Sequence, residues 1–223
     1  AIRNAAVFAC MAVILQPLSG DHSAKDGEQR QPAKLAAMEA VFQTRENSPL
    51  LIGGIPDERN KTVKYGLEIP GMLSFMISGN TGTEVKGLDQ IPENDHPPVL
   101  ITHLAFQLMV ALGMLMFAIS ILYLFSLWKK RSWQERPWLL KLFALAIPIG
   151  FIAVEAGWTV TEVGRQPWII YGFMRTADAV TPMPGIIYSF YLFTAVYFSL
   201  ALIVCFMLYR QIKMVPVLYD IPG

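Results

Sequence analysis

The sequence has few charged residues and very few cysteines and histidines. Charged residues make up 16% of its 223 residues and hydrophobic residues 54%, whereas about a quarter of an ordinary soluble domain is charged. Cys10 and Cys205 lie far apart, both in apolar segments, so we expect small buried residues and no disulfide or metal pair. His22, His96 and His103 do not have the spacing of a metal site. There is no basic patch with interleaved aromatic residues, and nothing else indicates nucleic-acid binding.

Long hydrophobic segments are what the sequence does have. A helix needs about 20 apolar residues to cross a bilayer, and Val99–Trp128, Trp138–Trp158 and Ile186–Tyr209 are each long enough. Ala5–Leu18 is shorter, and we interpret it as part of a transmembrane helix. A signal peptide would look similar, but no good cleavage site precedes Asp21. The predicted fold class is therefore all-α, a polytopic transmembrane helix bundle with a long extracytoplasmic loop.

The distribution of charge predicts how the helices are oriented. Basic residues cluster at Lys129–Arg131 and Arg136, at Arg210 and Lys213, and at Arg3, and short basic loops stay cytoplasmic. Residues 20–98 carry twelve acidic and eight basic side chains, which fits the outer face of a bacterial plasma membrane. The predicted parts are a partial transmembrane helix (1–19), an outer loop (20–98), a transmembrane helix (99–128), a cytoplasmic loop (129–137), a transmembrane helix (138–164), an outer connection (165–185), a transmembrane helix (186–212) and a cytoplasmic tail (213–223).

Glu155 is a carboxylate inside the long apolar segment that ends at Trp158. An ionisable side chain at membrane depth costs about 2.5–3.5 kcal/mol on insertion scales and usually has a function. Glu162 follows Glu155 by seven residues on the same helical face, and Arg165 comes next, so these groups could hold a charged cofactor. From the residues alone, two alternatives remain. One is a structural subunit in which Glu155 forms a salt bridge with Arg165, and the other is a transporter that uses Glu155 as its proton site. Transporters usually contain inverted repeats, and none is visible.

Other candidate residues are weaker when judged by spacing alone. Met109 offers a soft thioether ligand of the kind found in low-spin haem proteins, but His103 lies six residues earlier and points the opposite way on a straight helix. We expect His103 to be an interfacial polar residue. Lys34 and Glu39 lie on a predicted amphipathic helix over Pro32–Thr44. They are five residues apart, which misses the i,i+4 pairing geometry.

Several ordered motifs resemble subunit I of the cytochrome bd-type ubiquinol oxidases. The matches to the family's quinol-binding loop are Gly20-Asp21-His22-Ser23, Lys34-Leu-Ala-Ala-Met-Glu39-Ala40 and Gly53-Gly-Ile-Pro56-Asp57. Phe106-Gln-Leu-Met109-Val-Ala-Leu-Gly113 resembles the helix that carries a haem ligand. The most specific match is Val154-Glu155-Ala-Gly157-Trp158 followed by Gly164-Arg-Gln-Pro-Trp168.

This resemblance implies a terminal respiratory oxidase that oxidises quinol near the outer face and reduces dioxygen to water. Electrons would pass through a low-spin haem b, a high-spin haem b, and a haem d or further haem b. The implied iron ligands are Met109 for the low-spin haem and Glu155 for the high-spin haem. The other implied cofactor-binding residues are Gln107, Trp158 and Arg165, and the residues implied in quinol oxidation are Asp21, Lys34 and Glu39.

The resemblance also implies partners and two departures from the usual pattern. The partners are a second large membrane subunit, an earlier part of the same subunit that carries the family's histidine ligands, and the lipid membrane. We therefore expect residues 1–223 alone to be inactive. Gln107 stands where the best-known members have arginine. In addition, no extra segment intervenes between Ile77 and the helix predicted from Val99. This resembles a short-loop class of the family, which includes cyanide-insensitive oxidases that contain only haem b.

Overall fold

The computed structural model describes residues 2–128 and 137–219 and divides into two compact units, 1–179 and 180–223. The predicted cytoplasmic loop therefore lies almost entirely outside the described residues, and so does the side chain of Asp21. The described part is mostly helical. Since the first unit also contains short strands, the all-α prediction is corrected to a mostly helical fold.

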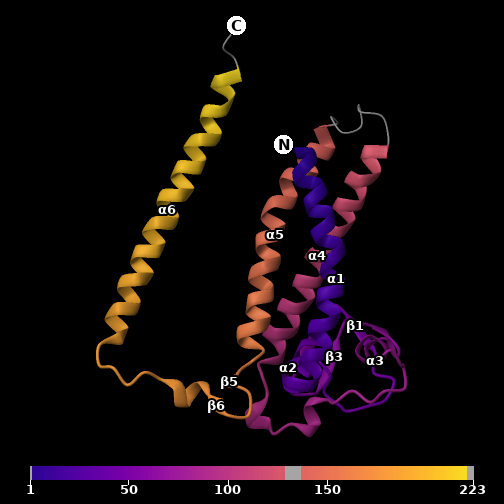
Figure 1. Ribbon diagram of the computed structural model, residues 1–223. Coiled ribbons are helices and arrows are strands. Elements are labelled where there is room, and N and C mark those ends of the chain that lie inside the picture. The colour runs from indigo at the N-terminus through magenta and orange to yellow at the C-terminus, as the bar shows by residue number, and fades with distance from the viewer. Residues whose placement is uncertain (1, 129–136, 220–223) are drawn as a thin grey trace. The chain divides into compact units, whose positions relative to one another are not determined.

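Three helices of the first unit run side by side (Figure 1), namely α1 (Ile2–Arg30), α4 (Val99–Trp128) and α5 (Pro137–Val163). α4 packs against both α1 and α5. Tyr123 and Phe143 join α4 to α5 with ring centroids 5.1 Å apart. The Cys10 thiol on α1 is buried and donates a hydrogen bond to the Ser120 carbonyl at 3.3 Å. This confirms that Cys10 is a small buried residue, whereas Cys205 is exposed and the same prediction is wrong for it.

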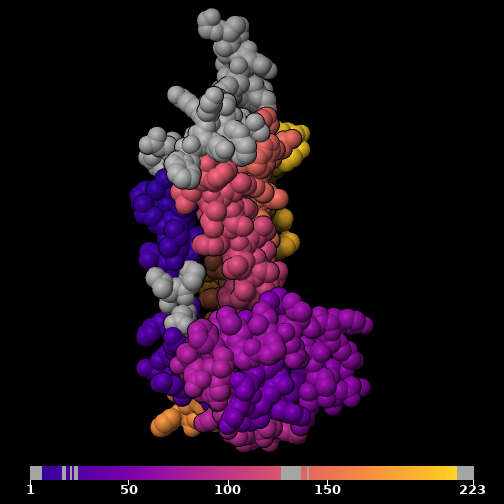
Figure 2. All heavy atoms as spheres, turned by 90° about the vertical axis from the view of Figure 1, so that its right-hand side faces the viewer, coloured from indigo at the N-terminus to yellow at the C-terminus, as the bar shows by residue number. Residues whose placement is uncertain are grey.

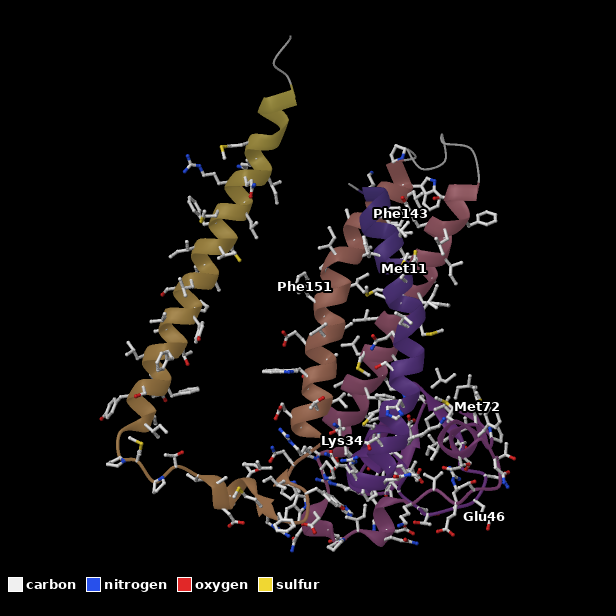
Figure 3. The ribbon with its side chains drawn as sticks, in the orientation of Figure 1. Met11, Lys34, Glu46, Met72, Phe143 and Phe151 are labelled. Atoms are coloured by element: carbon white, nitrogen blue, oxygen red, sulfur yellow. The ribbon has the colours of Figure 1, made fainter. Side chains whose placement is uncertain are left out.

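The apolar segments expected to cross a membrane are helical. Val99–Ser126, Pro137–Val163 and Ile186–Met214 are long and apolar enough to span a bilayer, and the last lies in α6 (Ile186–Tyr219) of the second unit. Large apolar side chains such as Phe151, 73% exposed on α5, project from these helices (Figure 3). The apolar part of α1 is shorter, Val7–Gln16. α1 also continues to Arg30, past the predicted boundary at residue 19.

The segment between α1 and α4 folds on itself instead of forming an open loop. It contains α2 (Pro32–Met38), α3 (Met72–Ser78) and 3-10 turns at Leu88–Gln90 and Glu93–Asp95, together with strands β1 (Leu50–Ile52), β2 (Ile55–Asp57), β3 (Thr62–Lys64) and β4 (Leu67–Ile69). The antiparallel pairs β1–β4 and β2–β3 share one register. They are two parts of one hairpin, interrupted where Gly53 and Gly54 adopt positive φ angles of 69° and 98°.

Two apolar clusters hold this segment together. One joins residues of α2 and β1 to Leu88 and to Val99 at the start of α4, and the other joins Leu35 and Val41 to α3 and Val85. Full burial of an aliphatic side chain stabilises a fold by about 1.5–3 kcal/mol. Figure 2 shows the segment as a compact mass at one end of α4. We call residues 31–98 the folded loop.

A small hairpin follows α5, formed by β5 (Trp168–Ile170) and β6 (Met174–Arg175) and ending in a 3-10 turn at Thr176–Ala179. The Arg175 guanidinium pairs with Asp95 of the folded loop at 2.6 Å and lies 4.8 Å from the centre of the Trp168 ring. These contacts tie the end of α5 to the folded loop.

Candidate functional site

The end of α2 places Glu39 at a tightly constrained position. The Val41 N–H donates to the Ala36 carbonyl at 2.8 Å and the Ala40 N–H to the Ala37 carbonyl at 3.3 Å. Ala40 has a φ of 51°. This is the Schellman pattern, with Glu39 as the C-cap residue. The predicted helix over Pro32–Thr44 therefore ends early, at Met38, because the backbone turns left-handed at Ala40.

The Glu39 carboxyl is almost completely enclosed. Its side chain is only 5% exposed, and among the described residues Oε2 has no hydrogen-bond partner. Desolvation disfavours the charged form and raises the pKa of Glu39 to about 7. A carboxyl with such a pKa can accept and release protons near neutral pH.

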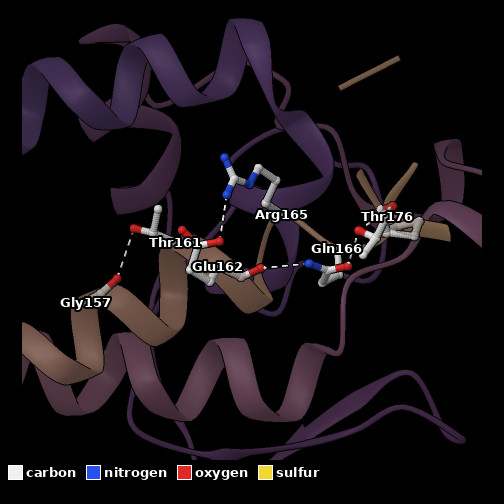
Figure 4. Close-up of polar contacts among 7 residues, drawn as sticks. Gly157, Thr161, Glu162, Arg165, Gln166 and Thr176 are labelled. Carbon is white, nitrogen blue, oxygen red and sulfur yellow. Dashed lines mark hydrogen bonds and ion pairs between the residues drawn. The ribbon is translucent and has the colours of Figure 1, made fainter. Parts of the chain in front are cut away.

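Lys34 lies at the other end of α2, beside the end of α5 (Figure 3). Partial burial lowers the pKa of the Lys34 ammonium, the positive charge of Arg165 lowers it further, and Glu162 opposes both effects. Arg165 pairs with Glu162 at 2.7 Å (Figure 4). Among the described residues, the buried Nε of Arg165 has no hydrogen-bond partner. Two cations and one carboxylate thus meet where α2 approaches α5.

Gly164 allows these elements to come this close. A Cβ added at Gly164 would lie 2.9 Å from Cγ2 of Thr102 on α4 and 3.3 Å from Cγ of Lys34 on α2. A shallow pocket opens beside this contact, lined by Gln31, Lys34, Pro97, Arg165, Trp168 and Tyr171. The structure therefore brings Lys34 and Arg165, predicted as separate functional residues, into one cluster.

Met109 faces α5. Its Sδ atom lies close to Gly157, since a Cβ added to Gly157 would be only 3.0 Å from the sulfur. The glycine therefore leaves room for the thioether. The three histidines lie elsewhere. The rings of His103 and His96 contact backbone carbonyls, and His22 lies on α1. Within the part of the chain that the structure describes, no group of three or more His, Cys, Asp or Glu residues could hold a metal ion.

Glu155 lies on an exposed apolar face of α5. The side chain is exposed, as are the neighbouring Phe151 and Trp158 at 73% and 68%. The partner of Arg165 is Glu162, so the alternative in which Glu155 forms a salt bridge with Arg165 is wrong. Because Gly157 is two residues, or about 200°, beyond Glu155 on the helix, Glu155 and Met109 lie on different sides of α5.

Two polar side chains of α4 bind the folded loop. The Gln107 amide donates to the Leu51 carbonyl and accepts from the Gly53 N–H, both at 3.0 Å. Gln107, predicted to bind a cofactor, thus has both ends of its amide bonded to the turn after β1. His103 is fully buried, with its ring nitrogens 2.8 Å from the Met38 carbonyl and 3.3 Å from the Gly53 carbonyl. The prediction of an interfacial His103 missed this, because the sequence gives no sign of which loop segments cover α4.

The comparison with known families decides the identity. The family described as "Cytochrome bd terminal oxidase subunit I" matches residues 1–216. The chain belongs to this family. The match confirms the resemblance found in the sequence and makes the chain a multi-pass membrane protein of the bd oxidase family. The transporter interpretation loses its support.

Individual relatives agree with the family match. The chain is 39% identical over 210 residues to the "Putative cytochrome bd menaquinol oxidase subunit I" of Bacillus subtilis (strain 168), covering 93% of this chain and 47% of that protein. It is 28% identical over 211 residues to the "Cytochrome bd ubiquinol oxidase subunit 1" of the same organism, covering 88% of this chain and 44% of the relative. The bd oxidase structure from Geobacillus thermodenitrificans superposes with a TM-score of 0.80 at 36% identity, over 92% of this chain and 47% of that one. The chain thus spans about half the length of these relatives.

Proposed function

We propose that this chain forms the quinol-oxidising half of a terminal oxidase subunit, which works with the rest of subunit I and a second membrane subunit. The observation that carries this proposal is the buried Glu39 carboxyl of the folded loop, whose Oε2 has no hydrogen-bond partner among the described residues. It lies at the position where the family resemblance expects a residue of quinol oxidation. The folded loop would face the outside of a bacterial plasma membrane. A matching relative is named for menaquinol and another for ubiquinol, so the proposed substrate class is a membrane quinol.

Oxidation of a quinol releases two protons and two electrons, and the chain offers groups for the protons. Glu39, with a pKa of about 7, would accept a proton from the quinol hydroxyl. The apolar clusters around α2 exclude water from this carboxyl. Lys34, held near Arg165 and Glu162, would bind and orient the oxygen at the other end of the quinol ring. Asp21 is proposed for the same site from the resemblance alone.

The residues also fit the proposed haems. Gly157 leaves room at the Met109 sulfur, and a thioether is a soft iron ligand found in low-spin haem proteins, so Met109 would hold the low-spin haem. Glu155 is an exposed carboxylate on an apolar face, beside the flat ring of Trp158, and we propose it as the ligand of a high-spin haem. Arg165 and Gln107 complete the proposed cofactor-binding set. The bound haems, two of type b and a third of type d or b, would carry electrons and reduce dioxygen to water, and the remaining ligands would come from the rest of the oxidase.

Replacement of the two α5 carboxylates tests the assignment of the high-spin ligand. The Glu155→Gln and Glu162→Gln variants of the complete oxidase each remove one negative charge from the same helical face. We expect Glu155→Gln to remove the high-spin haem b signal from the reduced-minus-oxidised spectrum while the low-spin signal remains. Glu162→Gln breaks the pair with Arg165 and should leave the high-spin signal in place. If Glu162→Gln alone removes that signal, the ligand is Glu162 and the Glu155 assignment is wrong.

A further inference from the structure

His103 is the only fully buried histidine among the described residues, and it bridges α4 and two segments of the folded loop. Nδ1 lies 2.8 Å from the Met38 carbonyl, and Nε2 lies 3.3 Å from the Gly53 carbonyl. Both partners are carbonyl oxygens, which can only accept. We infer that Nδ1 donates the main hydrogen bond, because its contact is the shorter one and the Met38 carbonyl needs a donor.

The need for a donor follows from how α2 ends. The last carbonyls of any helix lack partners inside the helix. In the Schellman motif at Ala40, the carbonyls of Ala36 and Ala37 receive N–H groups, but that of Met38 does not. His103 supplies the missing donor from α4. This carbonyl is partly buried, so leaving it without a partner would cost part of its desolvation penalty.

His103 thereby fixes the peptide unit that carries Glu39. In the Met38–Glu39 peptide, the carbonyl is bonded to His103, and the N–H donates to the Leu35 carbonyl at 3.0 Å. A peptide unit is planar, so bonds at both of its polar groups fix its orientation. The next residue, Ala40, is held in its left-handed conformation. The Cα of Glu39 is thus constrained on both sides, and with it the direction in which the carboxyl leaves the backbone.

The same helix face holds the second loop segment. Gln107 lies four residues after His103, one turn along α4, and binds the backbone of Leu51 and Gly53. Nε2 of His103 meets the same turn at Gly53. Because Met109 follows two residues later, the helix that positions Glu39 is also the helix that carries the proposed haem ligand.

We propose that His103 is a positioning residue for quinol oxidation. It sets the Glu39 carboxyl relative to α4 through the Met38 carbonyl, and it does not itself exchange protons with the quinol. This inference rests on the proposed function. It predicts that the hydrogen bond from Nδ1 is the one that positions Glu39. Side-chain amides can test this, because asparagine places a donor near Nδ1 and glutamine places one near Nε2.

The test uses the complete oxidase with His103→Asn, His103→Gln and His103→Phe, and Ser126→Ala as the matched control. Ser126 is another fully buried polar residue of α4, but its hydroxyl donates to the Tyr123 carbonyl of the same helix. Oxygen consumption is measured with a short-chain quinol, and separately with tetramethyl-phenylenediamine as a one-electron donor. We expect His103→Gln and His103→Phe to raise the KM for quinol or lower kcat by about tenfold, as for a partly buried carbonyl left without its donor. His103→Asn should restore most of this loss, and Ser126→Ala should change neither activity.

Several outcomes would overturn the proposal. If His103→Gln and His103→Phe lower both activities in parallel with haem content, His103 supports only the fold. Unchanged quinol kinetics in all three variants, or rescue by glutamine instead of asparagine, would also overturn it. If the parent oxidase consumes oxygen with the one-electron donor but not with quinol, the proposed function itself fails, and this result is distinct from any effect of His103.

Discussion

At the scale of single residues, Glu39 is the group whose chemistry the structure explains most directly. The carboxyl is buried at the end of a short helix and its Oε2 is unpartnered among the described residues. Desolvation therefore raises its pKa to about 7. The sequence predicted Glu39 only through the family resemblance. Its five-residue spacing from Lys34 gave no sign of a site, because spacing along a helix does not show which residues the rest of the chain covers.

The raised pKa predicts how quinol oxidation depends on pH. A carboxyl accepts a proton only when it is ionised, so kcat/KM for quinol should rise with pH, reach half its maximum near the pKa of about 7, and level off at higher pH. Glu39→Gln should lower turnover by about 10²–10⁴-fold, the usual contribution of a general base. The matched control is Glu46→Gln, at an exposed carboxylate of the same folded loop (Figure 3). Full turnover of Glu39→Gln with an unchanged pH profile would exclude Glu39 as the proton acceptor.

At the scale of helices and strands, the sequence predicted the long elements and missed the short ones. The three long apolar helices follow from their composition, and the structure confirms that each is long and apolar enough to span a membrane. The strands of the folded loop are only three residues each, too short for an alternating pattern to identify them. The early end of α2 also escaped prediction, because alanine at a left-handed position such as Ala40 is uncommon.

Packing between α4 and α5 yields a prediction with an internal control. Gly157 and Gly150 of α5 face Met109 and Met116 of α4, respectively, each pair one heptad from the other. A Cβ at residue 157 would lie 3.0 Å from the Met109 sulfur, whereas one at residue 150 would lie 3.6 Å from Cε of Met116. Gly157→Ala should therefore displace the thioether at an overpacking cost of about 1–3 kcal/mol.

The readout is the low-spin haem signal of the complete oxidase. Gly157→Ala should reduce that signal or shift its redox potential, and Gly150→Ala, whose added methyl makes ordinary van der Waals contact, should leave it unchanged. If both variants keep the parent signal, the contact between Gly157 and the Met109 sulfur does not position the sulfur. The proposed role of Met109 as a haem ligand then loses this structural support.

At the scale of the whole molecule, helices that can span a membrane carry a folded loop with a buried, proton-binding carboxyl. Composition predicted the apolar helices and a long segment between two of them, whereas Glu39 came from the family resemblance, and the family match shows which class of membrane protein the chain belongs to. The ligand assignments require more than this chain, because it spans about half of its relatives. The i,i+3 spacing of Glu162 and Arg165 permits their ion pair. Spacing could not indicate that Arg165 lies beside Lys34, since α2 and α5 are distant in sequence.

The most direct test of the central claim is haem extraction, with a reduced-minus-oxidised spectrum taken on the complete oxidase that contains this chain after addition of quinol. The account predicts haem b in low-spin and high-spin forms, reduced by quinol, with haem d or a further haem b at the oxygen site. Haem b alone would place the oxidase with the cyanide-insensitive members. Absence of haem, or haems that quinol does not reduce, would contradict the claim that this chain is the quinol-oxidising half of a terminal oxidase subunit.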